Sequence, residues 1–242
     1  MRLATVCARG GSKRLPGKNT RMLHGKPLWL WTAQQAAESG CFDNIVISTD
    51  DPMVGSLWDF DNINGNYQVI RIKRPDELAG DDAGKVPAIR HALVRAEELT
   101  GHTFDRIVDL DVTSPLRTLD DIRGFCAKLD KMQSGNLVSV CRARRNPYFN
   151  MIERYPYDGF ELCKHAKQRT VLRSQDAPEC WELNASMYGW RREALLGGGD
   201  NVINWNTDIY EMPPERSWDI DTVHDLEIVA FLMSKQREGV AA

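Results

Sequence analysis

The stretch LATVCARGGSKRLPGKN, residues 3–19, decides the fold class, because it joins an apolar run typical of a buried strand to a basic, glycine-rich loop. A loop that follows a strand of an open α/β sheet lies at the carboxyl edge, where such sheets bind their ligands. Gly10, Gly11 and Gly17 let the backbone approach an anion closely and present its N–H groups as a nest. We therefore expect this loop to hold a triphosphate with the help of its cations, which are Arg9, Lys13, Arg14 and Lys18.

The spacing of the loop excludes two well-known phosphate-binding motifs. A Walker A loop needs a first glycine at position 12 and Ser or Thr at position 19, but Ser12 and Asn19 stand there. A dinucleotide-binding fingerprint needs GxGxxG, whereas Gly10 and Gly11 are adjacent. The loop therefore belongs to another class of nucleotide site.

Short β-rich runs alternate with helical stretches through the first half of the chain, as expected for a parallel sheet covered by helices. Proline opens the first helical stretch, and Thr118 is suited to cap the third. We therefore predict an α/β fold with a doubly wound, mostly parallel sheet. The predicted strands are residues 3–8, 44–49, 67–72, 106–110 and 137–141, and the predicted helices are residues 27–38, 86–99 and 119–129.

Residues 142–180 break this alternation, since aromatic, charged and turn residues occur there without a helical period. We predict a hairpin extension that leaves the sheet but belongs to one domain spanning residues 1–242. Its apolar residues exceed what a thin ribbon can bury, so a homodimer is expected to cover them. After the extension, residues 186–190 and 210–212 are predicted strands and 222–235 a closing helix. The apolar residues concerned are Tyr148, Phe149, Met151, Ile152, Phe160 and Leu162.

The composition is that of a globular chain, with 42% hydrophobic and 27% charged residues. A net charge of −3 excludes a generally basic surface, so we expect no nucleic-acid partner. No apolar run is long enough to span a bilayer, and the first residues lack the apolar core of a signal peptide. We therefore expect a cytoplasmic protein without a membrane partner. The six cysteines lack CxxC spacing and favour neither a zinc site nor a disulfide framework.

Two carboxylates in SWDIDTVHD are candidates for a metal site. Asp219 and Asp221 are separated by one residue, and in an extended segment such residues point the same way. They could therefore converge on Mg²⁺, which prefers few carboxylates together with water and substrate phosphates. The alternative is that Asp221 or Thr222 caps the following helix, with Asp225 adding favourable charge near its start.

These motifs together resemble the CMP-sialic acid synthetases, also called acylneuraminate cytidylyltransferases. The resemblance implies a Rossmann-like nucleotidyltransferase fold and the joining of CTP to a nine-carbon α-keto acid sugar, a nonulosonic acid, with release of pyrophosphate. It rests on segments that follow the family's order, namely ARGGSK and KN around the loop, LHGKPLWLWT at 23–32, VISTDD at 46–51, RPDELAGDDA at 74–83, TSPLR at 113–117, RSQDAP at 173–178, NASMY at 184–188 and DIDT at 219–222.

The resemblance also implies residue roles at the nucleotide. Lys18 is expected to stabilise charge in the transition state, with Arg9 beside it on the phosphates. Arg74 resembles an arginine that approaches the cytosine, although Gly84 and Lys85 stand where the family often has a small hydroxyl residue. The expected nucleotide-binding residues are Ala8, Arg9, Gly10, Gly11, Ser12, Lys18, Asn19 and Arg74.

The family's sugar-binding segments imply a second set of residues. Arginine suits a bidentate grip on the sugar carboxylate, while amides and hydroxyls suit its hydroxyl groups. The expected sugar-binding residues are Arg173, Gln175, Asn184, Ser186 and Tyr188.

Asp111 departs from the pattern of the sialic acid synthetases, which resemble this segment but have a glutamine at the equivalent position. It resembles instead the aspartate that binds magnesium in the synthetases for the eight-carbon sugar Kdo. We therefore expect Asp111 and Asp221 to share Mg²⁺ and to be catalytic with Lys18 and Arg9, while Asp219 assists. Asp109, two residues earlier, is expected to point to the opposite side of its strand and to be structural.

Several alternatives remain at this point. Asp111 favours a Kdo-type or other sugar nucleotidyltransferase, whereas NASMY and RSQDAP oppose it. Asp111 together with Phe149, which stands near a lysine of the sialic acid enzymes, also favours a related sugar such as legionaminic or pseudaminic acid. Readings of another class are a small-molecule kinase with an irregular phosphate loop and a non-catalytic nucleotide-sugar binding protein.

Overall fold

A central sheet of seven strands is built from residues that alternate between its two faces. The computed structural model describes residues 1–54, 69–80, 82–154, 159–165, 171–237 and 239. In β1 (Arg2–Cys7), Ala4 and Val6 enter one hydrophobic cluster and Leu3 enters the cluster on the other face. This period of two lets one buried strand support two layers of helices.

The strand order is β11-β7-β10-β6-β1-β4-β5. All neighbouring pairs are parallel except those that β10 makes with β6 and β7, so one antiparallel strand divides an otherwise parallel sheet. The strands besides β1 are β4 (Asn44–Thr49), β5 (Val69–Lys73), β6 (Arg106–Leu110), β7 (Asn136–Arg142), β10 (Trp181–Arg191) and β11 (Thr207–Glu211).

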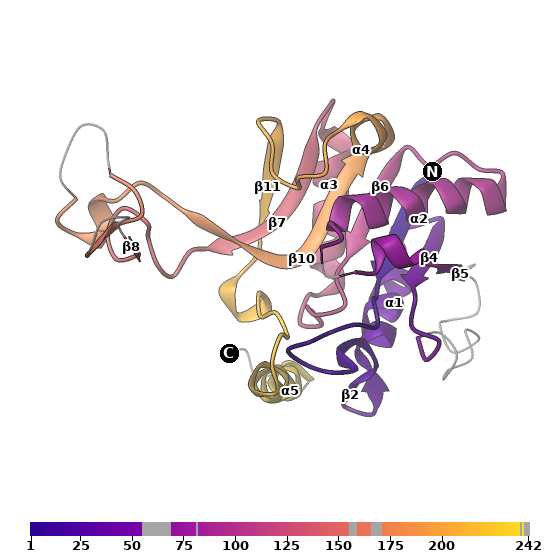
Figure 1. Ribbon diagram of the computed structural model, residues 1–242, viewed down its shortest axis with the longest axis horizontal. Coiled ribbons are helices and arrows are strands. Elements are labelled where there is room, and N and C mark those ends of the chain that lie inside the picture. Colours follow the sequence, from indigo (N-terminus) through magenta and orange to yellow (C-terminus); the bar gives the residue numbers. More distant parts are fainter. Residues whose placement is uncertain (55–68, 81, 155–158, 166–170, 238, 240–242) are drawn as a thin grey trace.

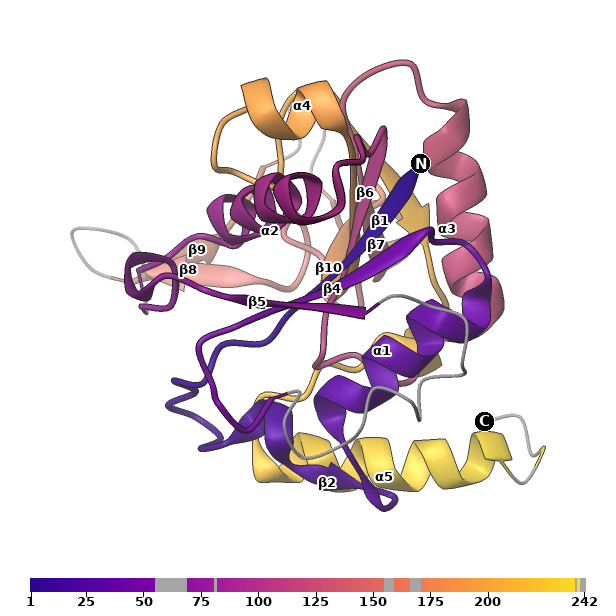
Figure 2. The same ribbon diagram turned by 90° about the vertical axis from the view of Figure 1, so that its right-hand side faces the viewer.

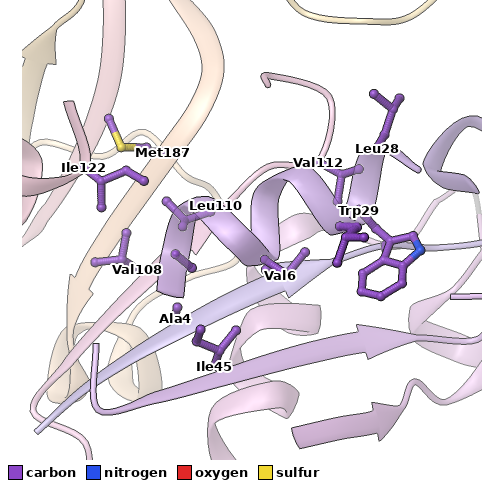
Figure 3. Packing of buried hydrophobic residues seen from close by; sticks show 14 of the residues in the cluster. Ala4, Val6, Leu28, Trp29, Ile45, Val108, Leu110, Val112, Ile122 and Met187 are labelled. Carbon is purple, nitrogen blue, oxygen red and sulfur yellow. The ribbon is translucent and has the colours of Figure 1, made fainter. Parts of the chain in front are cut away.

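Helices cover both faces of the sheet (Figure 2). Residues of α1 (Leu28–Ser39), α3 (Leu119–Lys131) and α5 (Val223–Arg237) enter the cluster that contains Val6, part of which is drawn in Figure 3. Residues of α2 (Lys85–Thr100) and α4 (Arg192–Gly197) enter the opposite cluster. Among the described residues, none of the helices is long and apolar enough to cross a membrane.

The predicted α/β class with a doubly wound, mostly parallel sheet is confirmed. Apart from β10 and β11, the predicted strands and helices lie within about two residues of the observed bounds, although residues 67–68 of one predicted strand lie outside the described residues. β11 begins three residues before the predicted strand at 210. Thr118 does cap α3, in a reciprocal capping box with Asp121. The sequence did not predict α4 or the small pair β2 (Met22–Leu23) and β3 (Lys26–Pro27), and β10 begins five residues before the predicted strand at 186.

Between β7 and β10 the chain leaves the sheet as a long arm, drawn on the left of Figure 1. The arm carries a two-stranded antiparallel ribbon of β8 (Ile152–Arg154) and β9 (Phe160–Leu162). Four of its large apolar side chains are exposed, since Met151 is 42%, Ile152 63%, Phe160 68% and Leu172 79% accessible, while Tyr148, Phe149 and Leu162 are half-buried. Such a surface is expected of a contact region for another molecule.

Candidate active site

The glycine-rich loop follows β1 and is held against the end of β4. The Ala8 N–H donates to the Ser48 carbonyl at 3.0 Å, and the Ala8 carbonyl accepts from Thr49 Oγ1 at 2.5 Å. Close approach favours glycine at position 10, because a Cβ there would lie 3.2 Å from Cβ of Asp51, a tight contact. Gly17 is required by a φ of 63°, just before the short 3-10 helix η1 (Lys18–Thr20).

The backbone of this loop differs from the open nest that the sequence predicted. The Gly10 N–H donates to Asp50 Oδ1 at 3.0 Å, and the Ser12 N–H donates to the Gly10 carbonyl at 2.9 Å. Two of the expected phosphate donors therefore already have partners in the protein. The roles of Ala8, Gly10, Gly11 and Ser12 at a nucleotide stay predictions.

A cavity of about 200 Å³ lies at the carboxyl edge of the sheet, where the ends of β1, β5 and β6 meet the start of α2. Residues far apart in the sequence line it together, among them Arg9, Lys18, Asn19, Arg74, Lys85 and Asp111. An adjoining cavity of about 330 Å³ shares Arg9, Lys18 and Asn19 and adds Lys13, Arg14 and Asp221. Ser12 also lines the second cavity, so the structure gathers one basic, concave surface from five of the predicted nucleotide residues.

Hydrogen bonds fix the cations of this surface in place. Arg9 Nη1 donates to the Gly80 carbonyl at 2.6 Å, and Asn19 Nδ2 donates to the Arg9 carbonyl at 2.8 Å. Arg74 is only 4% exposed and donates through Nη2 to the Ser48 carbonyl at 2.9 Å. Lys18 Nζ lies 2.9 Å from Asp221 Oδ1. Positive charge is therefore presented by side chains of restricted freedom, as an anion site requires.

Asp111 is paired with Lys85, which the sequence did not single out as a site residue. Lys85 Nζ donates to Asp111 Oδ2 and, at 3.1 Å, to Asp109 Oδ2, and it lies 4.5 Å from the ring centre of Tyr188. The expectation that Asp109 points away from Asp111 is therefore wrong, because residues two apart on a strand share a face. Asp109 is fully buried and also accepts from Thr5 Oγ1 at 2.8 Å.

The electrostatics of the pair follow from this geometry. Burial opposes the charge of Lys85, but the carboxylates of Asp111 and Asp109 outweigh it and raise the pKa of Lys85 well above its ordinary value. Burial likewise opposes the charge of Asp111, but Lys85 and Thr113 lower the pKa of Asp111 to about 2. Both groups are therefore charged at neutral pH.

Ile220 is fully buried, whereas Asp219 and Asp221 on either side of it are partly exposed, and their convergence on one metal ion stays a prediction. Asp221 accepts from Lys18 and, at 2.9 Å, from Arg14. Asp219 Oδ1 is buried and has no hydrogen-bond partner among the described residues. Burial, together with the carboxylates of Asp111 and Asp221, raises the pKa of Asp219 to about 6.

The donor chemistry of Asp219 and Asp221 fits a hard cation, since both offer carboxylate oxygens and one of those oxygens is unpartnered. In the described part of the chain, no three His, Cys, Asp or Glu side chains are grouped closely enough to hold a metal ion. Such a pair suits Mg²⁺, which proteins bind through one or two carboxylates while substrate phosphates complete the shell. Asp111 fits less well, because each of its oxygens already has a donor in the protein, whereas Asp219 keeps one oxygen without a partner among the described residues.

Two predicted sugar-binding residues are buried in this structure. Asn184 and Ser186 are 3% and 0% exposed, and neither side chain lines the cavities described above. Asn184 Oδ1 accepts from Ser139 Oγ at 2.7 Å, and the Ser186 carbonyl accepts from the Asp111 N–H at 3.0 Å. These bonds hold an irregularity of β10, where the register shifts and Ala185 adopts a φ of 51°. In the single chain both residues therefore shape the strand, and their contact with a sugar stays a prediction.

The other predicted sugar-binding residues are divided between two places. Tyr188 is 6% exposed and lies beneath Lys85 at the site, and burial raises the pKa of its hydroxyl to about 12. Arg173 and Gln175 lie on the exposed arm, and Arg173 makes an ion pair with Asp176 at 2.7 Å. The structure of a single chain therefore does not bring these two residues to the cavity.

Arg117 is a second residue whose role the sequence reasoning missed. Its guanidinium is 2% exposed and donates to the Asp111 carbonyl at 2.7 Å, the Ser186 carbonyl at 3.0 Å and Thr32 Oγ1 at 2.8 Å. Burial lowers the pKa of Arg117 to about 10. Because it ties β6, β10 and α1 together directly behind Asp111, it positions that carboxylate. The sequence feature that could have indicated this role is the position of Arg117 at the end of the TSPLR segment, which follows Asp111 closely.

Known proteins resemble this chain over nearly all of its length. A post-translational flagellin modification protein B of Campylobacter coli is 37% identical over 97% of this chain and 95% of its own. A CMP-N,N'-diacetyllegionaminic acid synthase of Campylobacter jejuni is 36% identical over 96% of this chain and 94% of its own. A solved CMP:2-keto-3-deoxy-manno-octonic acid synthetase, complexed with CTP, has a TM-score of 0.64 at 17% identity over 97% and 99% of the two chains, which shows a shared fold.

A basic, glycine-rich loop and several carboxylates are gathered at the carboxyl edge of this mainly parallel sheet, where open α/β sheets bind their ligands. The relatives and the family match place this site in the class of nucleotidyltransferases. The family model described as cytidylyltransferase matches residues 3–80, which hold the loop and Arg74. Together with the relatives above, this match shows that the chain belongs to the cytidylyltransferase family. The family resemblance read from the sequence is confirmed.

Proposed function

We propose that the protein joins CTP to a nonulosonic acid, giving the CMP-sugar and pyrophosphate. The anomeric hydroxyl oxygen of the sugar forms a bond to the α-phosphorus of CTP. The bond from that phosphorus to the bridging oxygen breaks, pyrophosphate leaves, and the hydroxyl proton is released. The legionaminic acid synthase that is 36% identical to this chain supports the choice of sugar class.

One observation carries the proposal: Arg9, Lys18, Asn19 and Arg74 line a single cavity together with Asp111. A nucleoside triphosphate needs several fixed cations along its phosphates, and a transferase also needs polar groups beside the reacting phosphorus. A protein that only binds the nucleotide has no need of a carboxylate such as Asp111 in the same cavity.

The residues divide the work by position. Lys18 lies in both adjoining cavities, so its ammonium is suited to charge that develops on the phosphates. Arg9 shares this surface and grips the leaving pyrophosphate. Arg74, fixed against the end of β4, faces the base. These contacts hold the two substrates in line, which supplies a large part of the rate.

Asp219 and Asp221 would hold Mg²⁺, which when bound would neutralise phosphate charge and help the pyrophosphate to leave. Asp221 pairs with Lys18 and Arg14, so it also holds these cations at the mouth of the site. Asp219 contributes the buried oxygen that lacks a partner among the described residues.

We further propose that the enzyme is a homodimer joined through the arm, because Ile152, Phe160 and Leu172 expose most of their apolar surface there. We place its activity in the cytoplasm, the compartment that supplies CTP. Both statements extend the proposed function, and the dimer is tested separately from it.

The test is pyrophosphate release with CTP, ATP, GTP or UTP, each with Mg²⁺ and a panel of eight- and nine-carbon α-keto acid sugars. We expect release with CTP and a nine-carbon acid, and little without the sugar. Each reaction is repeated without sugar to measure simple hydrolysis of the nucleotide. Release that favours an eight-carbon acid or another nucleotide would replace the proposed substrates, and folded protein that binds CTP without any release would point to a binding protein.

A further inference from the structure

Lys85 reaches the cavity at the carboxyl edge of the sheet from the start of helix α2. It is the first residue of α2, and its side chain, 27% exposed, reaches across to β6 and β10. There its ammonium contacts Asp109, Asp111 and the face of Tyr188. A single flexible side chain thus forms ion pairs with two carboxylates that no other Lys or Arg contacts among the described ion pairs.

All four carboxylate oxygens of this pair already have donors from the protein. Asp109 Oδ1 accepts from Thr5 and Oδ2 from Lys85. Asp111 Oδ1 accepts from Thr113 Oγ1 at 2.9 Å, and Oδ2 accepts from Lys85. A hard dication at these oxygens would have to displace the ammonium and would remain close to it, and like charges at close range repel.

The neighbouring carboxylates of Asp219 and Asp221 differ in one oxygen. Their segment is bonded to the Thr113 carbonyl through the Ile220 N–H at 2.9 Å. Asp219 Oδ1 is buried without a partner in the described residues, whereas Asp221 is partly exposed at the mouth of the phosphate surface and accepts from Lys18 and Arg14. A cation there could complete its shell with substrate phosphates and water, as Mg²⁺ commonly does. The two groups of carboxylates in the site are therefore not equivalent.

We propose that Lys85 is a positioning residue whose ammonium occupies the place of a divalent cation at Asp109 and Asp111, so that bound metal is held at Asp219 and Asp221 instead. The inference rests on the proposed function for the presence of a metal in the reaction. It removes Asp111 from the predicted metal ligands. It also gives Asp109 and Asp111 a counter-ion that does not depend on the Mg²⁺ concentration.

The experiment measures binding of Mn²⁺, used as the probe for Mg²⁺, to the full-length chain by electron paramagnetic resonance, with and without CTP. Lys85→Ser removes the ammonium and leaves room for a hydrated ion. We expect this variant to bind one additional Mn²⁺, and the double variant Lys85→Ser, Asp111→Asn to lose it again. Lys85→Arg keeps the charge and is the matched control, which gains no ion.

A second comparison leaves Lys85 in place. Asp221→Asn is expected to weaken Mn²⁺ binding at least about tenfold, because a ligand is lost, while Asp111→Asn leaves the affinity unchanged. If Lys85→Ser no longer unfolds cooperatively on heating, this second comparison tests the proposed metal position instead. Asp111→Asn is suited to it, because asparagine preserves the shape of the aspartate side chain.

Two results would overturn the inference. One is a folded Lys85→Ser variant that binds no more Mn²⁺ than the parent chain. The other is an Asp111→Asn variant that loses as much Mn²⁺ affinity as Asp221→Asn. Because the binding measurement needs no turnover, a chain that releases no pyrophosphate would contradict the proposed function without deciding between these outcomes.

Discussion

Lys18 is the single residue on which the proposed reaction depends most directly. Its side chain is 18% exposed and lies in both adjoining cavities, next to Arg9 and Asp221. We expect Lys18→Met to lower kcat for pyrophosphate release by about 100-fold or more, the usual effect of removing a donor that stabilises transition-state charge. The measurement is a pyrophosphate assay at saturating CTP and sugar, with thermal unfolding to confirm the fold.

Lys128→Met is the matched control for Lys18→Met. Lys128 lies on α3, is 39% exposed and pairs with Asp208, so its loss removes a surface cation of the same kind. We expect it to keep full turnover, because the value of a surface ion pair is small. Full turnover by Lys18→Met would contradict its assignment to the reacting phosphates.

Residues at strand ends were predictable, and residues whose role depends on a distant partner were not. Arg9, Asn19 and Arg74 could be placed at one edge, because parallel strands end together there. The contact between Lys85 and Asp111 could not be predicted, because the order of the strands in the sheet decides whether the start of α2 lies next to the end of β6. Asn184 was expected at the ligand, but the bulge in β10 turns its amide inward onto Ser139.

Helix α3 is attached to the segment before α5 by one buried carboxylate. Asp121 forms a capping box with Thr118, and both its oxygens lie 2.9 Å from the guanidinium of Arg216. Its side chain is only 5% exposed. We expect Asp121→Asn to lower the free energy of unfolding by about 2 kcal/mol at pH 7, because Arg216 loses its charged partner. Urea unfolding measures this difference.

The pH dependence of that effect has a definite sign. Burial opposes the charge of Asp121, but Arg216 and Thr118 outweigh it and lower its pKa. The stabilisation is therefore complete above the ordinary aspartate pKa, and it is lost as the pH falls through the lowered value. The difference between parent and variant should shrink below about pH 4. Asp120→Asn, at a position 89% exposed, is the control and should change stability by less than about 0.5 kcal/mol.

The irregularity in β10 concentrates backbone strain at Ala185, whose φ of 51° is unfavourable for a residue with a Cβ. Ala185→Gly should be neutral or raise the free energy of unfolding by up to about 1 kcal/mol, because the relieved strain is partly offset by chain entropy. Ala185→Val should lower it by about 1 to 3 kcal/mol. Urea unfolding of the pair is the measurement, and a glycine variant less stable than the valine variant would contradict the strain.

At the level of elements, the sequence predicted the strands of the parallel half best, because alternating apolar residues and following loops mark them. It could not predict that β10 runs antiparallel between β6 and β7, since strand order depends on pairing between distant segments. The short α4 was missed because six residues carry too little periodicity.

The arm sets the expected assembly of the whole molecule. Because its apolar side chains are exposed in the single chain, we expect a mass of about 55 kDa by light scattering, twice the 27.5 kDa of one chain. Ile152→Glu together with Phe160→Glu should give the single-chain mass, since buried charge opposes association.

Leu99→Glu is the matched control for the arm variants. Leu99 is 57% exposed near the end of α2, on a different part of the molecule from the arm (Figure 1). The same change there should leave the mass of the assembly unaltered. A single-chain mass for the parent protein at working concentration would contradict the dimer.

The position of β10 in the sheet also governs the order in which the protein can be made. As the ribosome releases the chain, β1, β4, β5 and β6 can pair early, but β7 and the β6 edge must wait for residues 181–191. Until then β6 presents unpaired backbone groups, and Asp111 lacks the Ser186 carbonyl that accepts its N–H. Nascent chains therefore carry an exposed strand edge through synthesis of the whole arm, which makes slow folding and chaperone engagement the expected route to the finished site.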